Sequence, residues 1–173
     1  TATAKKFNVD LTIVDAVHKS NQNRILHIGS KIINNINKNS VLSFMGLSFK
    51  PNTDDVRDSA SIIMISSIIR DGGFINAYDP VANKSMIEIF REINYFNSWE
   101  ESCKDVDAVA IMTEWNEFRS MSIERLKQLM KKPVLLDTRN IIDVKKLKVQ
   151  KYKFDNVGRG ITDVNWKHWN KWG

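Results

Sequence analysis

The sequence predicts an α/β fold, a mostly parallel sheet flanked by helices, on three observations. Compact apolar runs alternate with amphipathic segments from Val41 onward, which is typical of βαβ units. A long amphipathic segment, residues 10–36, precedes them. The chain of 173 residues is long enough for one compact domain with an appendage. We therefore expect one sheet domain preceded by a long helix.

The first expected element is the helix over residues 10–36. Its apolar residues recur at steps of three and four, broken only around Asn21, and Asp10 is a candidate N-cap. The segment is longer than the usual globular helix of about 10–14 residues. Much of it must therefore pack against the following domain or against a second copy of itself.

The remaining elements follow from the alternation of patterns along the chain. Strands are expected at 41–47, 74–78, 93–96, 107–113 and 134–137, and helices at 59–71, 83–91, 99–104 and 122–131. The Gly72–Gly73 pair is predicted to end the helix at 59–71 in a left-handed conformation. From about Gly160 the composition changes toward Trp, Lys and Asn, which indicates a C-terminal appendage.

Composition excludes several classes of protein. With 42% hydrophobic and 27% charged residues the chain resembles a soluble protein, and no apolar run approaches the roughly 18 residues of a membrane span. No secretory signal is visible at the start. The one cysteine, Cys103, has no CxxC partner or His cluster, so neither a disulfide nor a metal site is indicated. We expect a cytoplasmic protein without a membrane partner.

The net charge of +6 leaves nucleic acid, a membrane surface or an acidic small ligand as candidate partners. Lys and Arg are spread along the chain, and their densest cluster, "DVKKLKVQKYK", lacks interleaved stacking aromatics. This distribution favours a solvated basic face and no nucleic-acid partner.

The most polar loop of the predicted sheet is "GLSFKPNTDDVRDSAS", residues 46–61, where the first strand ends. Lys50 supplies a mobile cation and Arg57 a planar fork, and both suit phosphate or carboxylate oxygens. Ser59 is expected to cap the next helix, whose N-terminal dipole favours an anion. Asp54 and Asp55 could bind ribose or sugar hydroxyls, or pair with the two cations. An exposed, salt-bridged loop without a ligand is the alternative.

Two further strands end in polar residues, at 113–115 ("TEW") and at 137–140 ("DTRN"). Because the carboxyl ends of parallel strands meet at one edge of a sheet, these residues and the loop at 46–61 should converge on one ligand site. Asp137 could instead simply accept backbone N–H groups.

The segment "NAYDPVA", residues 76–82, resembles the second strand of a dinucleotide fold, where an acidic residue holds a ribose. The GxGxxG that should follow the first strand is absent, so a nicotinamide cofactor should not bind here in the usual way. We interpret Asp79–Pro80 as a turn that closes the strand. Nothing near Cys103 would lower its pKa, so a nucleophilic role is not indicated.

Five motifs in order, "GLSFKPNTDDVRDSAS", "AYDPVA", "MTEWNEFR", "LLDTRNIID" and "VGRG", resemble the C-terminal part of the UDP-glucose/GDP-mannose (nucleotide-sugar) dehydrogenases, most closely the bacterial UDP-glucose 6-dehydrogenases. The resemblance implies that residues 1–40 end a central dimerisation region, with a homodimer through the helix 10–36. It implies a Rossmann-like UDP-sugar-binding domain at 41–160, and leaves 161–173 as a C-terminal tail.

The resemblance also implies the chemistry: two successive NAD-dependent oxidations of UDP-glucose to UDP-glucuronate. Phe49 and Lys50 would contact the UDP-sugar, Arg139 would help to bind it, and Arg57 would reach the NAD held mainly by a separate N-terminal domain. The family's nucleophilic Cys would lie upstream of Thr1, so this chain is expected to hold no catalytic residue and to be inactive alone.

Three alternatives stay open at this point. The substrate could be another nucleotide sugar, such as UDP-N-acetylmannosamine or GDP-mannose. The chain could be a non-catalytic module that binds sugar nucleotides or only dimerises. The charge and the Trp content alone would also permit an RNA-binding protein.

Overall fold

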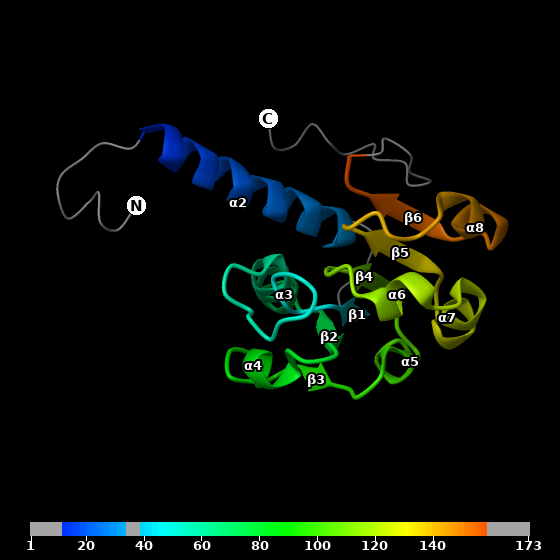
Figure 1. The fold of residues 1–173 in the computed structure, drawn as a ribbon. Coiled ribbons are helices and arrows are strands. Elements are labelled where there is room, and N and C mark those ends of the chain that lie inside the picture. Colours follow the sequence, from blue (N-terminus) through cyan, green and yellow to red (C-terminus); the bar gives the residue numbers. More distant parts are fainter. Residues whose placement is uncertain (1–11, 34–38, 159–173) are drawn as a thin grey trace.

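A computed structural model describes residues 12–33 and 39–158 of the chain (Figure 1). Its centre is a six-stranded sheet in the order β3-β2-β1-β4-β5-β6, and every neighbouring pair is parallel. The strands are β1 (Val41–Met45), β2 (Phe74–Tyr78), β3 (Asn94–Tyr95), β4 (Ala108–Ile111), β5 (Val134–Asp137) and β6 (Lys153–Asn156). The predicted α/β class is confirmed. The strand order reverses between β1 and β4, which creates the crevice where such sheets bind ligands.

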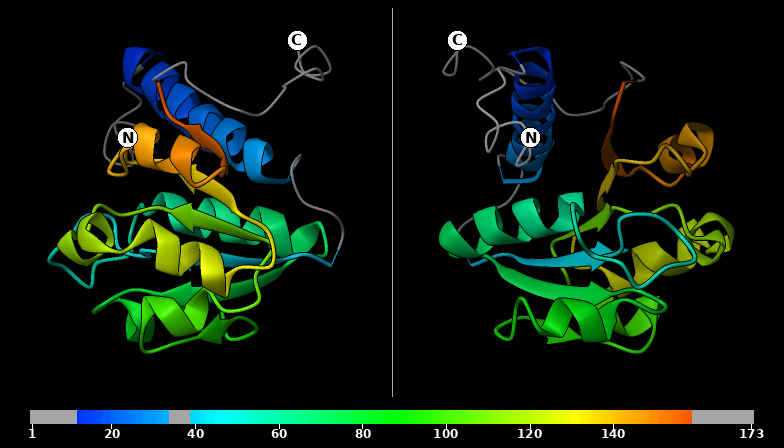
Figure 2. Two further views of the ribbon diagram at one scale, coloured as in Figure 1. Left: turned by 90° about the vertical axis from the view of Figure 1, so that its right-hand side faces the viewer. Right: turned by 60° about the vertical axis from the view of Figure 1, so that its left-hand side comes forward.

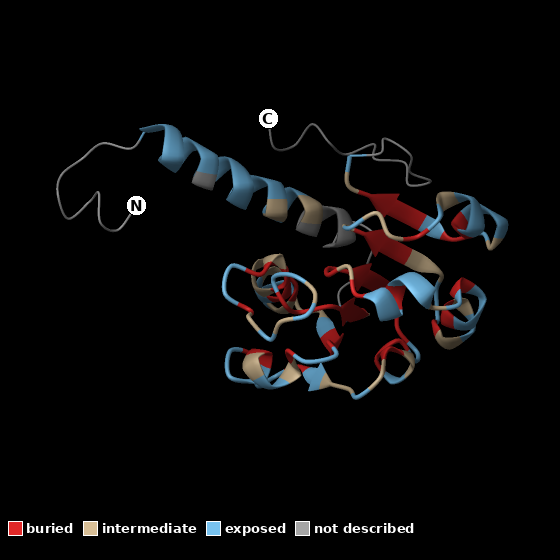
Figure 3. Ribbon diagram, viewed as in Figure 1, coloured by how far each residue is buried: buried red, intermediate tan, exposed pale blue. Residues whose placement is uncertain are grey.

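The described helices are α2 (Thr12–Ile33), α3 (Ala60–Arg70), α4 (Asn83–Ile87), α5 (Trp99–Ser102), α6 (Asn116–Ser120), α7 (Ile123–Leu129) and α8 (Val144–Val149). They cover both faces of the sheet, which is why the strands are buried almost throughout (Figure 3). Phe44 and Met45 illustrate the division, since neighbouring strand residues point to opposite faces. Phe44 joins the apolar cluster under α3 and α4, and Met45 joins the cluster under α5 to α8.

Both ends of α3 confirm the sequence prediction. Ser59 is the N-cap, and its hydroxyl oxygen accepts a hydrogen bond from the Ser61 N–H at 3.3 Å. At the other end Gly72 has φ +83°, and the Gly73 N–H donates to the Ile68 carbonyl oxygen at 2.9 Å. This bond pattern satisfies carbonyl groups that the last turn of a helix leaves unpaired.

Three elements were not predicted from the sequence: α6, α8 and β6. Helix α6 has five residues, too few for a helical period to show. Helix α8 and the start of β6 lie in the lysine-rich cluster "DVKKLKVQKYK", whose charge concealed their apolar pattern. Leu147, Tyr152 and Phe154, within or beside the cluster, are buried. Helix α4 ends at Ile87 and not at residue 91, because the chain turns there to bury Phe90.

Among the described side chains of helix α2, those that pack on the core of the sheet domain lie in its C-terminal half. Ile25 and Ile28 pack against the apolar cluster that contains α3, whereas Ile13, Val14 and Val17 are 80%, 41% and 52% exposed. Figures 1 and 2 show the N-terminal half projecting beyond the domain. The expected packing against the following domain is thus confirmed for one half. Asp10 and residues 34–36 lie outside the described residues.

Among residues 12–33 and 39–158, no helix combines the length and the apolar character that a membrane span requires.

Candidate functional site

The loops that follow β1, β2 and β4 are joined by one buried carboxylate, Asp79. Its Oδ2 accepts hydrogen bonds from the Leu47 N–H (2.7 Å), the Ser48 N–H (3.1 Å), the Ser48 hydroxyl (3.0 Å) and the Trp115 indole N–H (3.2 Å). Its Oδ1 accepts from the N–H groups of Val81 (3.0 Å) and Ala82 (2.9 Å). The predicted turn at Asp79–Pro80 is confirmed. The same side chain also fixes the start of the loop 46–58, a role that the sequence alone did not indicate.

Gly46 brings the ends of β1 and β4 together. Its φ of +94° lies in the region that side chains disfavour, and its N–H donates to the Tyr78 carbonyl oxygen at 2.8 Å. A Cβ atom at Gly46 would lie 2.6 Å from Thr113 Cβ. The Thr113 hydroxyl in turn donates to the Ser48 carbonyl oxygen at 2.8 Å. This close approach sets the floor of the crevice between β1 and β4.

The polar loop 49–58 is ordered by internal bonds. The Phe49 N–H donates to the Asp55 carbonyl oxygen at 2.9 Å. The Arg57 guanidinium donates to both oxygens of Asp55, at 3.0 Å from Nε and 2.8 Å from Nη2. These charge-assisted bonds lower the pKa of Asp55 to about 2. Two roles were predicted for Asp55, and in the structure it pairs with a cation, Arg57. The side chain of Arg57 is nevertheless 87% exposed.

Arg139 lies on a turn that Asp137 organises at the end of β5. The buried Asp137 accepts hydrogen bonds from the N–H groups of Arg139 (3.0 Å) and Ile142 (2.8 Å). Burial raises the pKa of Asp137. The Arg139 Nε donates to the Met112 carbonyl oxygen at 2.6 Å and lies 3.3 Å from Glu114 Oε2. Asp137 is thus a backbone acceptor, and the Arg139 Nε is held by the end of β4.

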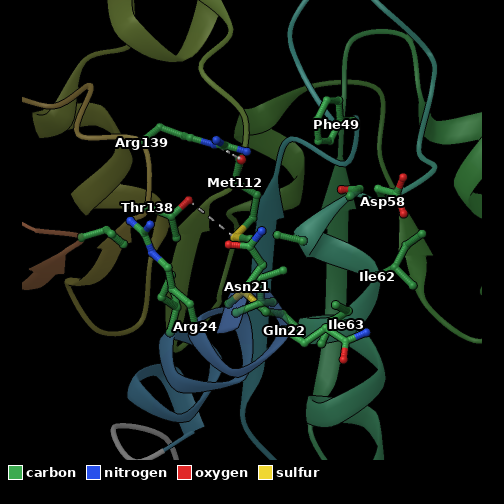
Figure 4. A pocket seen from close by; sticks show the side chains of 16 residues that line it. Asn21, Gln22, Arg24, Phe49, Asp58, Ile62, Ile63, Met112, Thr138 and Arg139 are labelled. Atoms are coloured by element: carbon green, nitrogen blue, oxygen red, sulfur yellow. Dashed lines mark hydrogen bonds between the residues drawn. The ribbon is translucent and has the colours of Figure 1, made fainter. Parts of the chain in front are cut away.

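A pocket of about 700 Å³ lies over these strand ends, between α2, α3 and the loops (Figure 4). Each of the three parts contributes to its lining, which includes Asn21, Arg24, Phe49, Ser59, Thr138 and Arg139. The structure therefore brings together two of the residues predicted to bind a ligand, Phe49 and Arg139. Lys50 and Arg57 lie on the same loop as Phe49, but neither lines the pocket.

The pocket residues of α2 were missed by the sequence analysis. Asn21, Gln22 and Arg24 line the pocket from the helix, yet polar residues on an amphipathic helix usually only face solvent. The one available signal was the break in the apolar period around Asn21. A helix face that borders a ligand pocket needs no apolar residue there.

Cys103 is fully buried at the end of α5. Its thiol donates to the Ser43 hydroxyl oxygen at 3.4 Å, and burial raises the pKa of the thiol to about 11. A thiol without thiolate character near neutral pH is a poor nucleophile. Over the described ranges, no group of three or more His, Cys, Asp or Glu side chains could hold a metal ion.

Curated relatives match nearly the whole chain. A UDP-glucose 6-dehydrogenase of Bacillus subtilis is 31% identical over 159 residues, which cover 90% of this chain and 34% of that protein. A UDP-glucose 6-dehydrogenase of Rhizobium meliloti is 32% identical and covers 91% of this chain and 37% of that protein. The chain thus spans about a third of the length of these relatives.

Solved structures share the fold. A UDP-glucose dehydrogenase from Pyrobaculum islandicum superposes with a TM-score of 0.69 at 19% identity, over 84% of this chain and 33% of that one. A UDP-D-ManNAc dehydrogenase from Pyrococcus horikoshii gives a TM-score of 0.59 at 25% identity, over 82% of this chain and 31% of that one. The family model described as "UDP-glucose/GDP-mannose dehydrogenase family, UDP binding domain" matches residues 43–144. With its parallel sheet and a pocket at the strand ends, the chain belongs to the UDP-glucose/GDP-mannose dehydrogenase family and contains that family's UDP binding domain.

Proposed function

We propose that this chain is the substrate-binding and dimer-forming portion of an NAD-dependent UDP-glucose 6-dehydrogenase, which oxidises UDP-glucose to UDP-glucuronate. The observation that carries the proposal is the pocket at the carboxyl ends of β1, β4 and β5, whose lining includes both Phe49 and Arg139. The relatives of both bacterial species above are named UDP-glucose 6-dehydrogenase.

The pocket offers chemistry that suits a nucleotide sugar. The guanidinium of Arg139 presents a planar fork to phosphate oxygens, with its Nε already fixed by Met112. The N-terminus of α3, an eleven-residue helix, contributes Ser59 and Ala60 to the lining, and the dipole of a helix favours an anion at this end. Phe49, which is 51% exposed, offers an aromatic surface to the ligand.

Lys50 and Arg57 are proposed to act from outside the pocket lining. Lys50 is exposed next to Phe49, so its flexible ammonium can reach a bound UDP-sugar. Arg57 is held by Asp55 and remains open to solvent, which supports a contact with NAD carried by another domain.

The sheet of this chain does not fit NAD in the usual dinucleotide mode. Asp79 directly follows β2, where such folds hold a ribose, but its oxygens already accept six hydrogen bonds from the protein. The glycine-rich fingerprint is absent after β1. We therefore propose that NAD is bound mainly by a separate N-terminal domain. With its only thiol buried, this chain is expected to have no dehydrogenase activity by itself.

The proposed dimer would form through the helix 10–36. Its support is the uncovered apolar side of α2 at Ile13, Val14 and Val17, which leaves water when two copies meet. The proposed domain boundaries are residues 1–40 for the dimerisation region, 41–160 for the UDP-sugar-binding domain and 161–173 for the tail.

Calorimetric titration tests the proposal, with UDP-glucose, UDP-glucuronate, GDP-mannose and NAD as ligands. We expect saturable binding of the UDP-sugars and none of NAD. Preference for GDP-mannose would assign a different nucleotide sugar to the site, and failure of all sugar nucleotides to bind would contradict the proposal.

The variants Lys50→Ala and Arg57→Ala distinguish the proposed roles of the two cationic side chains of the loop. Lys50→Ala should weaken UDP-glucose binding about tenfold, as expected for loss of one charge-assisted contact. Arg57→Ala should change that affinity by less than about twofold, because its guanidinium is engaged by Asp55. Equal losses in the two variants would contradict this division of roles.

A further inference from the structure

Helix α2 is part of the pocket and not only a neighbour of it. Ile25 and Ile28 line the pocket and also pack on the core cluster that contains α3. This packing fixes the turn of α2 that carries Arg24, which lines the pocket as well. In the view of Figure 4, Arg24 extends from α2 toward Thr138, on the side of the pocket where Arg139 lies.

The charge of Arg139 is largely balanced before any ligand binds. Its Nε lies 3.3 Å from Glu114 Oε2, with both side chains only about a third exposed, at 35% and 32%. Asp58 adds a carboxylate to the pocket lining. Without Arg24, the lining would present one cation, Arg139, whose charge Glu114 already balances, beside the carboxylate of Asp58. That balance of charge would oppose the binding of a diphosphate.

Arg24 differs from Arg139 in having no such partner. Across residues 12–33 and 39–158, its guanidinium has neither an ion pair nor a side-chain hydrogen bond, and the residue is exposed. A guanidinium has five N–H donors and binds phosphate oxygens through two of them at once. All the donors of Arg24 are available to a ligand in the pocket.

We propose that Arg24 of α2 is a second phosphate-binding residue of this pocket and acts with Arg139 on the diphosphate of the nucleotide sugar. The inference rests on the proposed function, since it assigns a further residue to the same site. It makes α2, which was expected to serve dimerisation, a structural part of substrate binding.

The test compares Arg24→Gln with Lys19→Gln in the whole 173-residue chain. Both variants remove one positive charge from α2, but Lys19 is exposed and does not line the pocket. The affinities for UDP and for uridine are measured by chemical-shift titration. Arg24→Gln should raise the Kd for UDP about tenfold, the loss of a charge-assisted contact, and should change the Kd for uridine by less than about twofold. Lys19→Gln should leave both values within about twofold.

Each other result overturns the assignment in a distinct way. Equal UDP affinities in Arg24→Gln and Lys19→Gln would show that Arg24 does not bind the phosphates. Equal losses for UDP and uridine would mean that the variant displaces α2 and does not remove a phosphate contact. Absence of UDP binding by the unaltered chain would contradict the proposed function, and the role of Arg24 with it.

Discussion

Replacement of Asp79 by alanine is expected to lower the free energy of unfolding by at least about 3 kcal/mol. The substitution leaves the N–H groups of Leu47, Ser48 and Ala82 without their acceptor inside the protein. Each buried donor without a partner costs about 1–3 kcal/mol. Urea denaturation followed by circular dichroism measures the change.

Asp143→Ala is the matched control for this variant. Asp143 is an exposed N-cap whose Oδ1 accepts one hydrogen bond, from the Lys145 N–H at 2.9 Å. Loss of such a cap costs about 1 kcal/mol. If Asp79→Ala were no more destabilising than Asp143→Ala, Asp79 would not be the residue that joins the loops.

Gly46→Ala is the second substitution for which we expect a large loss of stability, roughly 3 kcal/mol. About 1 kcal/mol comes from the positive φ of +94°, and about 2 kcal/mol from forcing a Cβ atom against Thr113. That contact, 2.6 Å to Thr113 Cβ and 2.7 Å to Thr113 N, is too short to relax without moving the end of β4. Urea denaturation followed by circular dichroism also measures this loss of stability.

Gly158→Ala separates the two contributions. Gly158 also has a positive φ, +80°, but among the described residues a Cβ atom there would meet nothing within 4 Å. The Gly158→Ala variant should therefore lose only the free energy that comes from the backbone conformation, about 1 kcal/mol. Equal losses at Gly46 and Gly158 would mean that the loops have room to move apart, and that the floor of the pocket is not fixed by close packing.

Most of the strands that the sequence predicted are largely apolar. Strands β1, β4 and β5 are buried on both faces, so nearly all of their residues are apolar. Strand β6 lies at the edge of the sheet and begins with an exposed lysine. It has few apolar residues and follows a basic cluster, so the sequence showed no strand pattern there. An edge strand of this kind is recognised only from its pairing with the neighbouring strand, here β5.

The lining of the pocket was predicted where it depends on strand ends, and missed where it depends on tertiary packing. Phe49 and Arg139 follow strands directly, so the rule that parallel strands present their carboxyl ends together sufficed. Arg24 lies more than a hundred residues from Arg139 in the sequence. Its place in the pocket depends on how α2 packs on α3, which no local pattern encodes.

The most direct test of the central claim is a ¹H–¹⁵N chemical-shift titration of the chain with UDP. The account predicts that the largest shifts occur at the backbone amides of Phe49, Ser59 and Arg139, which line the pocket at the strand ends. Another pocket, of about 580 Å³, is lined by residues between Asn140 and Lys148, including Lys145 and Lys148. Shifts confined to that surface, or no shifts at saturating UDP, would contradict the claim that the pocket between α2, α3 and the strand ends is the nucleotide-sugar site.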